Sequence, residues 1–168
     1  PEDALFRNPA VTEVPMDRAR IWREGIIAGL LGAGGVAFWF LVVDLIAGGA
    51  FATPEMLGRT LLSVLGKGID LSATMNVFWY SLFHVGAFVA MGVLVSQLVA
   101  VSERTPGVLA GLGLFFVVFE MGFYGLTVFL SQSEQFGALA WYQIGAANLL
   151  AAFLMGSYLW REHPELRA

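Results

Sequence analysis

Long runs of residues without charge constrain this chain more than any other feature of its sequence. At least four segments of 18 or more largely uncharged residues can be drawn. A helix of about 20 apolar residues crosses the roughly 30 Å hydrocarbon core of a membrane. Only 13% of the 168 residues are charged, about half the share in a typical soluble domain. The sequence therefore predicts an all-α integral membrane protein.

The apolar runs predict four transmembrane helices in one bundle. Their expected ranges are 21–47, 73–100, 106–130 and 136–161. They form one transmembrane domain over 21–161, preceded by a cytoplasmic N-terminal arm over 1–20 and followed by a short cytoplasmic tail over 162–168. Short connections between helices, such as the turn before residue 106, predict antiparallel neighbours.

The segment 48–72 contains too few consecutive apolar residues to span a membrane. Thr53, Pro54 and Glu55 make a helix start, with a capping hydroxyl, a proline at the first helical position and an acid in the first turn. Leucines at positions 57, 61, 62 and 65 line one side of the following residues. We expect a short amphipathic helix that lies on the outer membrane surface.

Small residues recur at helical spacing in the first and last predicted helices. One stripe contains Gly25, Gly29, Ala33 and Ala37, and the other contains Gly145, Asn148, Ala152 and Gly156. Small side chains let two helix backbones approach closely in a membrane. We therefore expect both stripes to be packing faces.

The positive charges are distributed unevenly between the two ends of the predicted helices. Seven of the nine Lys and Arg residues lie in the arm and the adjoining helix start, in the turn before the third helix, or in the tail and the end of the last helix. Only Arg59 and Lys67 lie on the opposite side. The positive-inside rule therefore predicts that both termini are cytoplasmic.

Each predicted transmembrane helix carries one strongly polar residue in the outer half of the membrane. These residues are Asp44, His84, Glu120 and Asn148. Tyr80 lies one turn before His84, and Asn76 lies one turn before Tyr80. An ionisable group inside a membrane is costly and usually faces protein or water. The four residues therefore define a candidate site within the bundle.

A set of carboxylates and a histidine on separate helices suits a first-row transition metal. The candidate ligands are Asp44, His84 and Glu120. Haem held through His84 is a second option, with Tyr80 and Tyr124 as further cofactor-binding residues. Its other axial ligand would come from a second subunit or from a methionine, namely Met91, Met121 or Met155.

Structural roles for the same residues remain open. His84 is then a core histidine bonded to Glu120 or Tyr124, and Glu120 is a protonated acid bonded to a Tyr or Asn side chain. Asp44 lies near the membrane surface, where it is solvated or caps a helix end. Asn148 acts as an interhelical hydrogen-bonding residue. A proton or ion role for Glu120 is a further alternative.

Several function classes are excluded by residues that the sequence lacks. The chain has no Cys, so it has no disulfide and no thiolate metal site. No Lys lies inside a predicted helix to form a retinal Schiff base, and no Arg ladder marks a voltage sensor. No basic patch suits nucleic acid, and no phosphate-binding loop or nucleophile elbow occurs. His163 lies in the predicted tail, at the wrong depth for the candidate site.

Five stretches carry a resemblance that covers most of residues 22–164: GVAFWFLVVDLIAG, TPEMLG, SLFHVGAF, FFVVFEMGF and GAANLLAAFLMGSYLWREHP. With them the chain resembles small uncharacterised bacterial four-helix inner-membrane proteins. The resemblance implies the four-helix fold and a multi-pass position in the bacterial inner membrane. It implies no activity.

The leading hypothesis for the function is a non-catalytic accessory or scaffold subunit of a larger bacterial membrane complex, an electron-transfer complex being one option. Such a chain has little room for chemistry and much surface for helix packing. Its expected partners are membrane lipids, including a bound lipid, and other membrane subunits or further copies of itself. The alternatives are a metal- or haem-binding membrane protein and a proton-coupled carrier or channel that acts as an oligomer.

Overall fold

The computed structural model describes residues 18–65, 71–102 and 141–164, together with residues 107, 108, 111, 113, 114 and 116. Its helices are α1 (Arg18–Ile46), α2 (Ala52–Leu65), α3 (Ala73–Ser102) and α5 (Trp141–Glu162). The six separate residues between 107 and 116 are also helical. Most of the predicted helix over 106–130 lies outside the described residues, as does the arm before residue 18. The prediction of an all-α chain is confirmed for the part that is described.

Two of these helices, α1 and α3, are long and apolar enough to cross a membrane. They contain 29 and 30 residues, which at 1.5 Å per residue is roughly 45 Å each. The last predicted span corresponds to α5, which has 22 residues and is not one of the two. A bundle with four membrane spans therefore stays a prediction.

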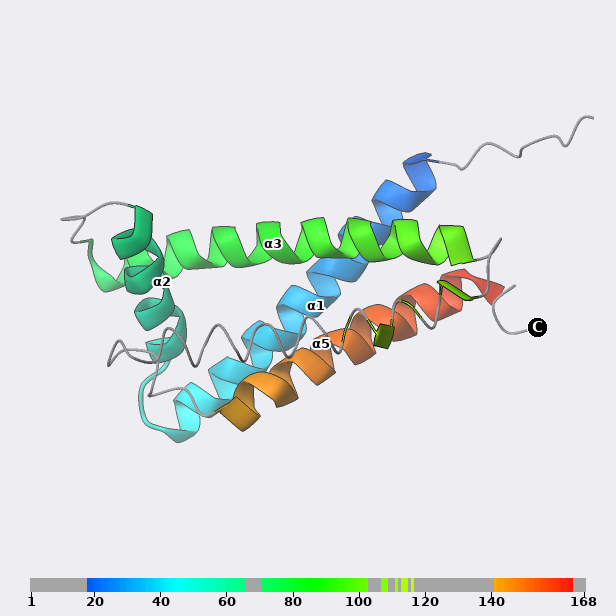
Figure 1. The fold of residues 1–168 in the computed structure, drawn as a ribbon. Helices are drawn as coiled ribbons and strands as arrows, with labels where there is room; N and C mark the ends of the chain where they lie inside the picture. The colour runs from blue at the N-terminus through cyan, green and yellow to red at the C-terminus, as the bar shows by residue number, and fades with distance from the viewer. Residues whose placement is uncertain are drawn as a thin grey trace, which may run out of the picture.

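α1 crosses α3 at a point where both helices lack side chains, and the two helices then diverge toward the end where α2 lies (Figure 1). A Cβ atom added at Gly25, Gly29 or Gly92 would collide with backbone atoms of the opposite helix. The packing role predicted for the first small-residue stripe is thus confirmed for Gly25 and Gly29. Ala37, the last residue of that stripe, is exposed.

α5 packs beside α1 through a neighbouring set of small residues. A Cβ at Gly32 would lie 2.6 Å from the Met155 sulfur, and one at Gly35 would lie 2.7 Å from a methyl carbon of Leu154. The buried residues of α5 are Ala147, Ala151, Met155 and Leu159. This face differs from the predicted stripe, whose Gly156 has open space around an added Cβ. Gly145, Asn148 and Ala152 of the predicted stripe are half-buried, and their packing role stays a prediction.

A tight turn joins α1 to α2. The Gly48 N–H donates to the Leu45 carbonyl at 3.2 Å, and the Gly49 N–H donates to the Asp44 carbonyl at 3.0 Å. These two bonds form a Schellman motif, which needs a left-handed residue after the helix. Gly48 has a φ of 85°, so glycine is required there because a Cβ would strain the backbone.

α2 forms a helix in the segment where the sequence predicts one, and it packs across the start of α3. Leu62, one of the predicted apolar side, is buried. A Cβ at Gly58 would collide with the backbone of Asn76, so glycine permits direct contact between the two helices. The predicted position of α2 on the outer membrane surface stays a prediction.

Candidate functional site

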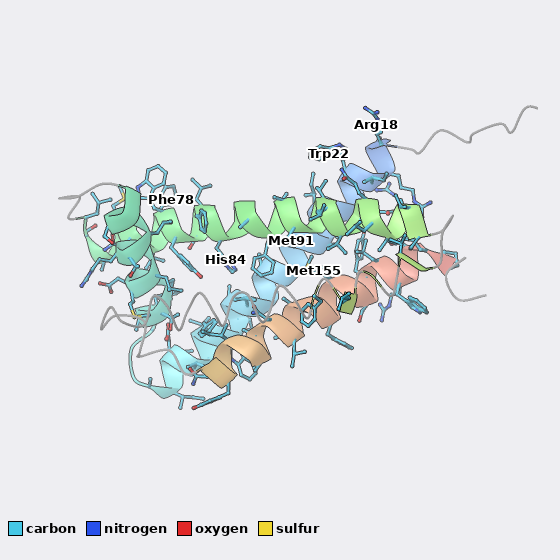
Figure 2. All side chains as sticks on the ribbon, in the orientation of Figure 1. Arg18, Trp22, Phe78, His84, Met91 and Met155 are labelled. Carbon is cyan, nitrogen blue, oxygen red and sulfur yellow. The ribbon has the colours of Figure 1, made fainter. Side chains whose placement is uncertain are left out.

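His84 lies half-buried on α3 and faces α1, whereas Phe78 projects from the opposite side of the same helix (Figure 2). The His84 Nε2 atom lies 3.3 Å from the carbonyl oxygen of Ala33. A carbonyl oxygen only accepts, so Nε2 donates, and Nδ1 of the neutral ring is left as an acceptor. A structural hydrogen bond of His84 within the bundle is thus found, whereas the predicted bond to Glu120 or Tyr124, which lie outside the described residues, stays a prediction. The partner is a backbone carbonyl of α1.

Aromatic rings flank His84 along the same face of α3. The Tyr80 ring stacks on the imidazole with a centroid distance of 5.6 Å, and the Phe88 ring lies 4.8 Å away on the other side. The prediction that Tyr80 and His84 share one helix face is confirmed, because side chains four apart lie on the same side of a helix. Asn76 is buried, and its side-chain N–H donates to the Leu71 carbonyl at 3.3 Å. Asn76 therefore stabilises the start of α3.

Asp44 is buried at the end of α1 and caps α2 from a distance. Its Oδ2 accepts from the Thr53 N–H at 2.9 Å, and its Oδ1 accepts from the Thr53 hydroxyl at 2.6 Å. The Glu55 N–H donates to the Phe51 carbonyl, so Phe51 holds the N-cap position with a side chain that cannot accept. Asp44 supplies the missing acceptor. The predicted capping role of Asp44 is confirmed, and the prediction that Thr53 is the cap is wrong.

The structure does not bring Asp44 and His84 together as ligands of one ion. His84 contacts α1 at Ala33, about three helical turns before Asp44, which is roughly 16 Å along the axis. First-row metals bind nitrogen and oxygen ligands at about 2 Å. Within the described residues, no group of three His, Asp or Glu side chains could hold a metal ion. A site that combines His84 with Glu120, which lies outside those residues, stays a prediction.

The other two candidates add little to this geometry. Tyr124 lies outside the described residues. Asn148 is half-buried on α5 and follows Ala147, which packs near Val36 of α1. Its predicted interhelical hydrogen bond stays a prediction.

A cavity of about 480 Å³ lies where α1 and α3 diverge, beside the start of α2. Five aromatic rings belong to its lining, those of Phe38, Phe40, Phe51, Tyr80 and His84. The other described lining residues are mostly apolar, and Asp44 and Thr53 lie at the α2 end. Two of the predicted cofactor-binding residues, Tyr80 and His84, therefore share the wall of one cavity.

A second polar cluster, which the sequence did not predict, joins the start of α1 to the end of α5. The Glu24 Oε1 accepts from Arg20 Nε at 2.7 Å, and its Oε2 accepts from His163 Nε2 at 2.9 Å. Glu24 is 1% exposed and His163 is 2% exposed. Arg20 also donates to the Glu162 carbonyl at 2.8 Å. His163 is thus a buried partner of α1 that directly follows the end of α5, although no sequence pattern indicated that this tail residue would be buried.

The sequence contains a signal for one pairing in this cluster, that of Arg20 with Glu24, but none for the pairing of Glu24 with His163. Arg20 and Glu24 are four residues apart on a helix, the spacing at which opposite charges pair. His163 is far from them along the chain, and no local pattern connects it to Glu24.

No protein-family model, curated protein sequence or solved structure matches this chain. The resemblance to small bacterial four-helix inner-membrane proteins stays a prediction.

Proposed function

We propose that this chain is a four-helix, multi-pass protein of a bacterial inner membrane with both termini in the cytoplasm. We propose further that it acts as a non-catalytic accessory or scaffold subunit of a larger membrane complex. The observation that carries the proposal is the distribution of side-chain size across α1, α3 and α5. Small residues fill the contacts between helices, and large apolar side chains point outward. This arrangement is typical of helices that pack within lipid.

The outward side chains are large and apolar on all three helices. Phe38 on α1 is 64% exposed, Phe83 on α3 is 56% exposed, and Phe153 on α5 is 69% exposed. Apolar surface in water costs about 25 cal/mol per Å², and contiguous exposed patches mark protein or membrane contacts. The exposure of Phe153 supports a position in lipid for α5 as well as for the two longer helices.

The same surface supports a packing role. Large apolar faces on three helices can contact lipid or the helices of other subunits. Gly86 lies on the exposed side of α3, and a Cβ added there would have open space around it. An unoccupied glycine on an outward face lets another transmembrane helix approach closely. The proposed partner is therefore an apolar helix of another membrane subunit.

Cysteine labelling tests the topology. The natural chain has no Cys, so a single cysteine introduced at Arg18 or at Ser63, both exposed, reports on that position alone. A membrane-impermeant maleimide is expected to label Ser63→Cys in cells with an intact inner membrane. It is expected to label Arg18→Cys only after permeabilisation. Labelling of Arg18→Cys in intact cells would contradict the proposed orientation.

Extraction from native membranes in a mild detergent tests the subunit role. The chain is expected to migrate with larger membrane subunits, at a native mass well above that of one copy. The variant His84→Ala is expected to keep this assembly, because its hydrogen bond lies inside the chain. Migration of the wild type as a single copy would rule out the scaffold role.

Two alternative functions remain proposals. A metal or haem bound through His84 is supported by the Nδ1 atom, which has no partner within the described residues. It predicts stoichiometric metal or visible absorbance that His84→Ala removes. A proton-coupled carrier rests on Glu120, which lies outside the described residues. It predicts a pH-dependent flux into vesicles that Glu120→Gln abolishes.

A further inference from the structure

The cavity between α1 and α3 combines an aromatic wall with two hydrogen-bonding atoms that lack a partner. The Tyr80 hydroxyl and the His84 Nδ1 have no hydrogen-bond partner in the part of the chain that the structure describes, although both residues line the cavity. The other oxygens nearby are used, since Asp44 binds Thr53 and the Ser81 hydroxyl donates to the Val77 carbonyl at 2.7 Å. The Tyr80 hydroxyl and the His84 Nδ1 are therefore the polar side-chain atoms of the described lining that remain open to a ligand, whereas Asp44 and Thr53 bind each other at the α2 end.

The hydrogen-bonding capacity of Tyr80 and His84 favours a ligand that carries a hydroxyl group. The His84 Nε2 donates to the Ala33 carbonyl, so Nδ1 of the neutral ring can only accept. The Tyr80 hydroxyl can donate. A hydroxyl group on a ligand can donate to the His84 Nδ1 and accept from the Tyr80 hydroxyl. A ketone or ether oxygen accepts only, and a hydrocarbon satisfies neither atom.

The other residues of the lining favour a ligand whose hydroxyl group is attached to an aromatic ring. Five rings belong to the lining, and aromatic rings favour offset-stacked and edge-to-face contacts with one another. The volume of about 480 Å³ lies within the range of about 300–1,000 Å³ for small-molecule sites. Leu30 and Phe38 line the cavity and are also exposed, so a molecule dissolved in the lipid can reach it.

We propose that this cavity binds a membrane-soluble phenol, meaning an apolar molecule whose aromatic ring carries a hydroxyl group. The hydroxyl lies between Tyr80 and His84, and the ring contacts the aromatic wall. This site goes beyond the proposed scaffold role and does not depend on it, because it lies within a single copy of the chain.

Binding of three matched probes to the purified full-length chain in lipid nanodiscs tests the site. The probes are 4-octylphenol, its methyl ether 4-octylanisole, and octylbenzene, and binding is counted above that of protein-free nanodiscs. The phenol is expected to saturate one site per chain. The ether and the hydrocarbon are expected to bind roughly 10-fold more weakly, because each leaves at least one polar atom without a partner. Equal binding of all three probes would overturn the proposal.

Two variants locate the site and a third provides the control. Gly34 lines the cavity and has open space around an added Cβ, so Gly34→Leu is expected to fill the cavity and abolish saturable binding. Gly86→Leu makes the same change on an exposed helix face outside the cavity and is expected to bind like the wild type. Tyr80→Phe is expected to reduce the preference for phenol over ether. Unchanged phenol binding by Gly34→Leu, with a melting temperature close to that of the wild type, would overturn the proposal.

The Gly34→Leu variant could also fail to fold, and Ala37→Phe then serves instead. Ala37 is exposed and lines the same cavity. Its enlargement is expected to abolish phenol binding, and retained binding in the folded variant would overturn the proposal.

Discussion

The two ends of α1 contact the rest of the molecule in opposite ways. Near its start, α1 meets α3 through glycines and meets α5 through the buried pair of Glu24 and His163. Near its end, α1 has diverged from α3, and a cavity and the start of α2 lie between them. Backbone contact thus closes one end, whereas a cavity lined by aromatic rings separates the two helices at the other end.

Each end also contains one buried acid of α1, and the two acids are stabilised differently. Glu24 is paired with Arg20 and with a histidine from the far end of the chain. Within the described residues, the donors that Asp44 binds are neutral, namely the N–H and the hydroxyl of Thr53, a short distance along the chain. A buried carboxylate therefore requires donors, and these donors need not carry charge.

The largest expected effect is at the closed end. Gly29→Leu places a side chain against the Phe88 carbonyl and within 2.6 Å of the Val89 Cα position, atoms that cannot move without separating α1 from α3. We expect a loss of stability of about 3 kcal/mol or more, seen as loss of the monodisperse peak in size-exclusion chromatography. Gly34→Leu on the same helix is the control and is expected to stay folded. Equal behaviour of the two variants would show that the ends of α1 do not differ in packing.

A somewhat smaller effect is expected from the buried pair at the same end. Glu24→Ala removes the buried carboxylate that accepts from His163 Nε2, and losing one partner of a buried hydrogen bond costs about 1–3 kcal/mol. The measurement is the free energy of unfolding in mixed micelles for Glu24→Ala, His163→Ala and the double variant. Because the partners share one interaction, the double variant is expected to lose less than the sum of the single losses. Additivity within about 0.5 kcal/mol would mean that the pair contributes nothing as a pair.

The smallest of the three effects is expected at the open end. Asp44→Ala removes the acceptor that caps α2, and loss of an N-cap costs about 0.5–2 kcal/mol. Hydrogen exchange at the Thr53 amide is expected to accelerate, while exchange in the middle of α3 stays unchanged. Asp44→Asn keeps one acceptor oxygen and is expected to have a weaker effect. An unchanged Thr53 amide in Asp44→Ala would show that another group caps α2.

The helical elements near both ends could be predicted from the sequence because their signals are local. The uncharged runs within α1 and α3 are long enough to indicate helices, and the residues around Pro54 indicated the start of α2 within two positions. Asp44 was recognised as a capping candidate because it lies close to the end of its apolar run.

The rotation of the helices could be predicted only where glycines mark a face, as at Gly25 and Gly29 of α1. α1 and α3 are apolar on all sides, so their pattern has no preferred face. On α5, two stripes of small residues exist at adjacent rotations, and the structure buries the one that contains Ala147 and Ala151. The pairing of Glu24 with His163 depends on that rotation and joins residues far apart in the chain. The hydrophobic pattern of the sequence therefore does not reveal this pairing.

The glycine crossing has a mechanical consequence for α2. Helices that pack through glycines have few side chains at the crossing to fix its angle, and Asp44 lies about four helical turns beyond Gly29, a lever arm of roughly 22 Å. A turn of about 5° would move the end of α1 by roughly 2 Å. α2 opposes such a turn because it is attached to both helices. It is hydrogen-bonded to α1 through Asp44 and Thr53, and it contacts α3 at Gly58 and Asn76. The length of this one short helix therefore sets how widely the cavity opens.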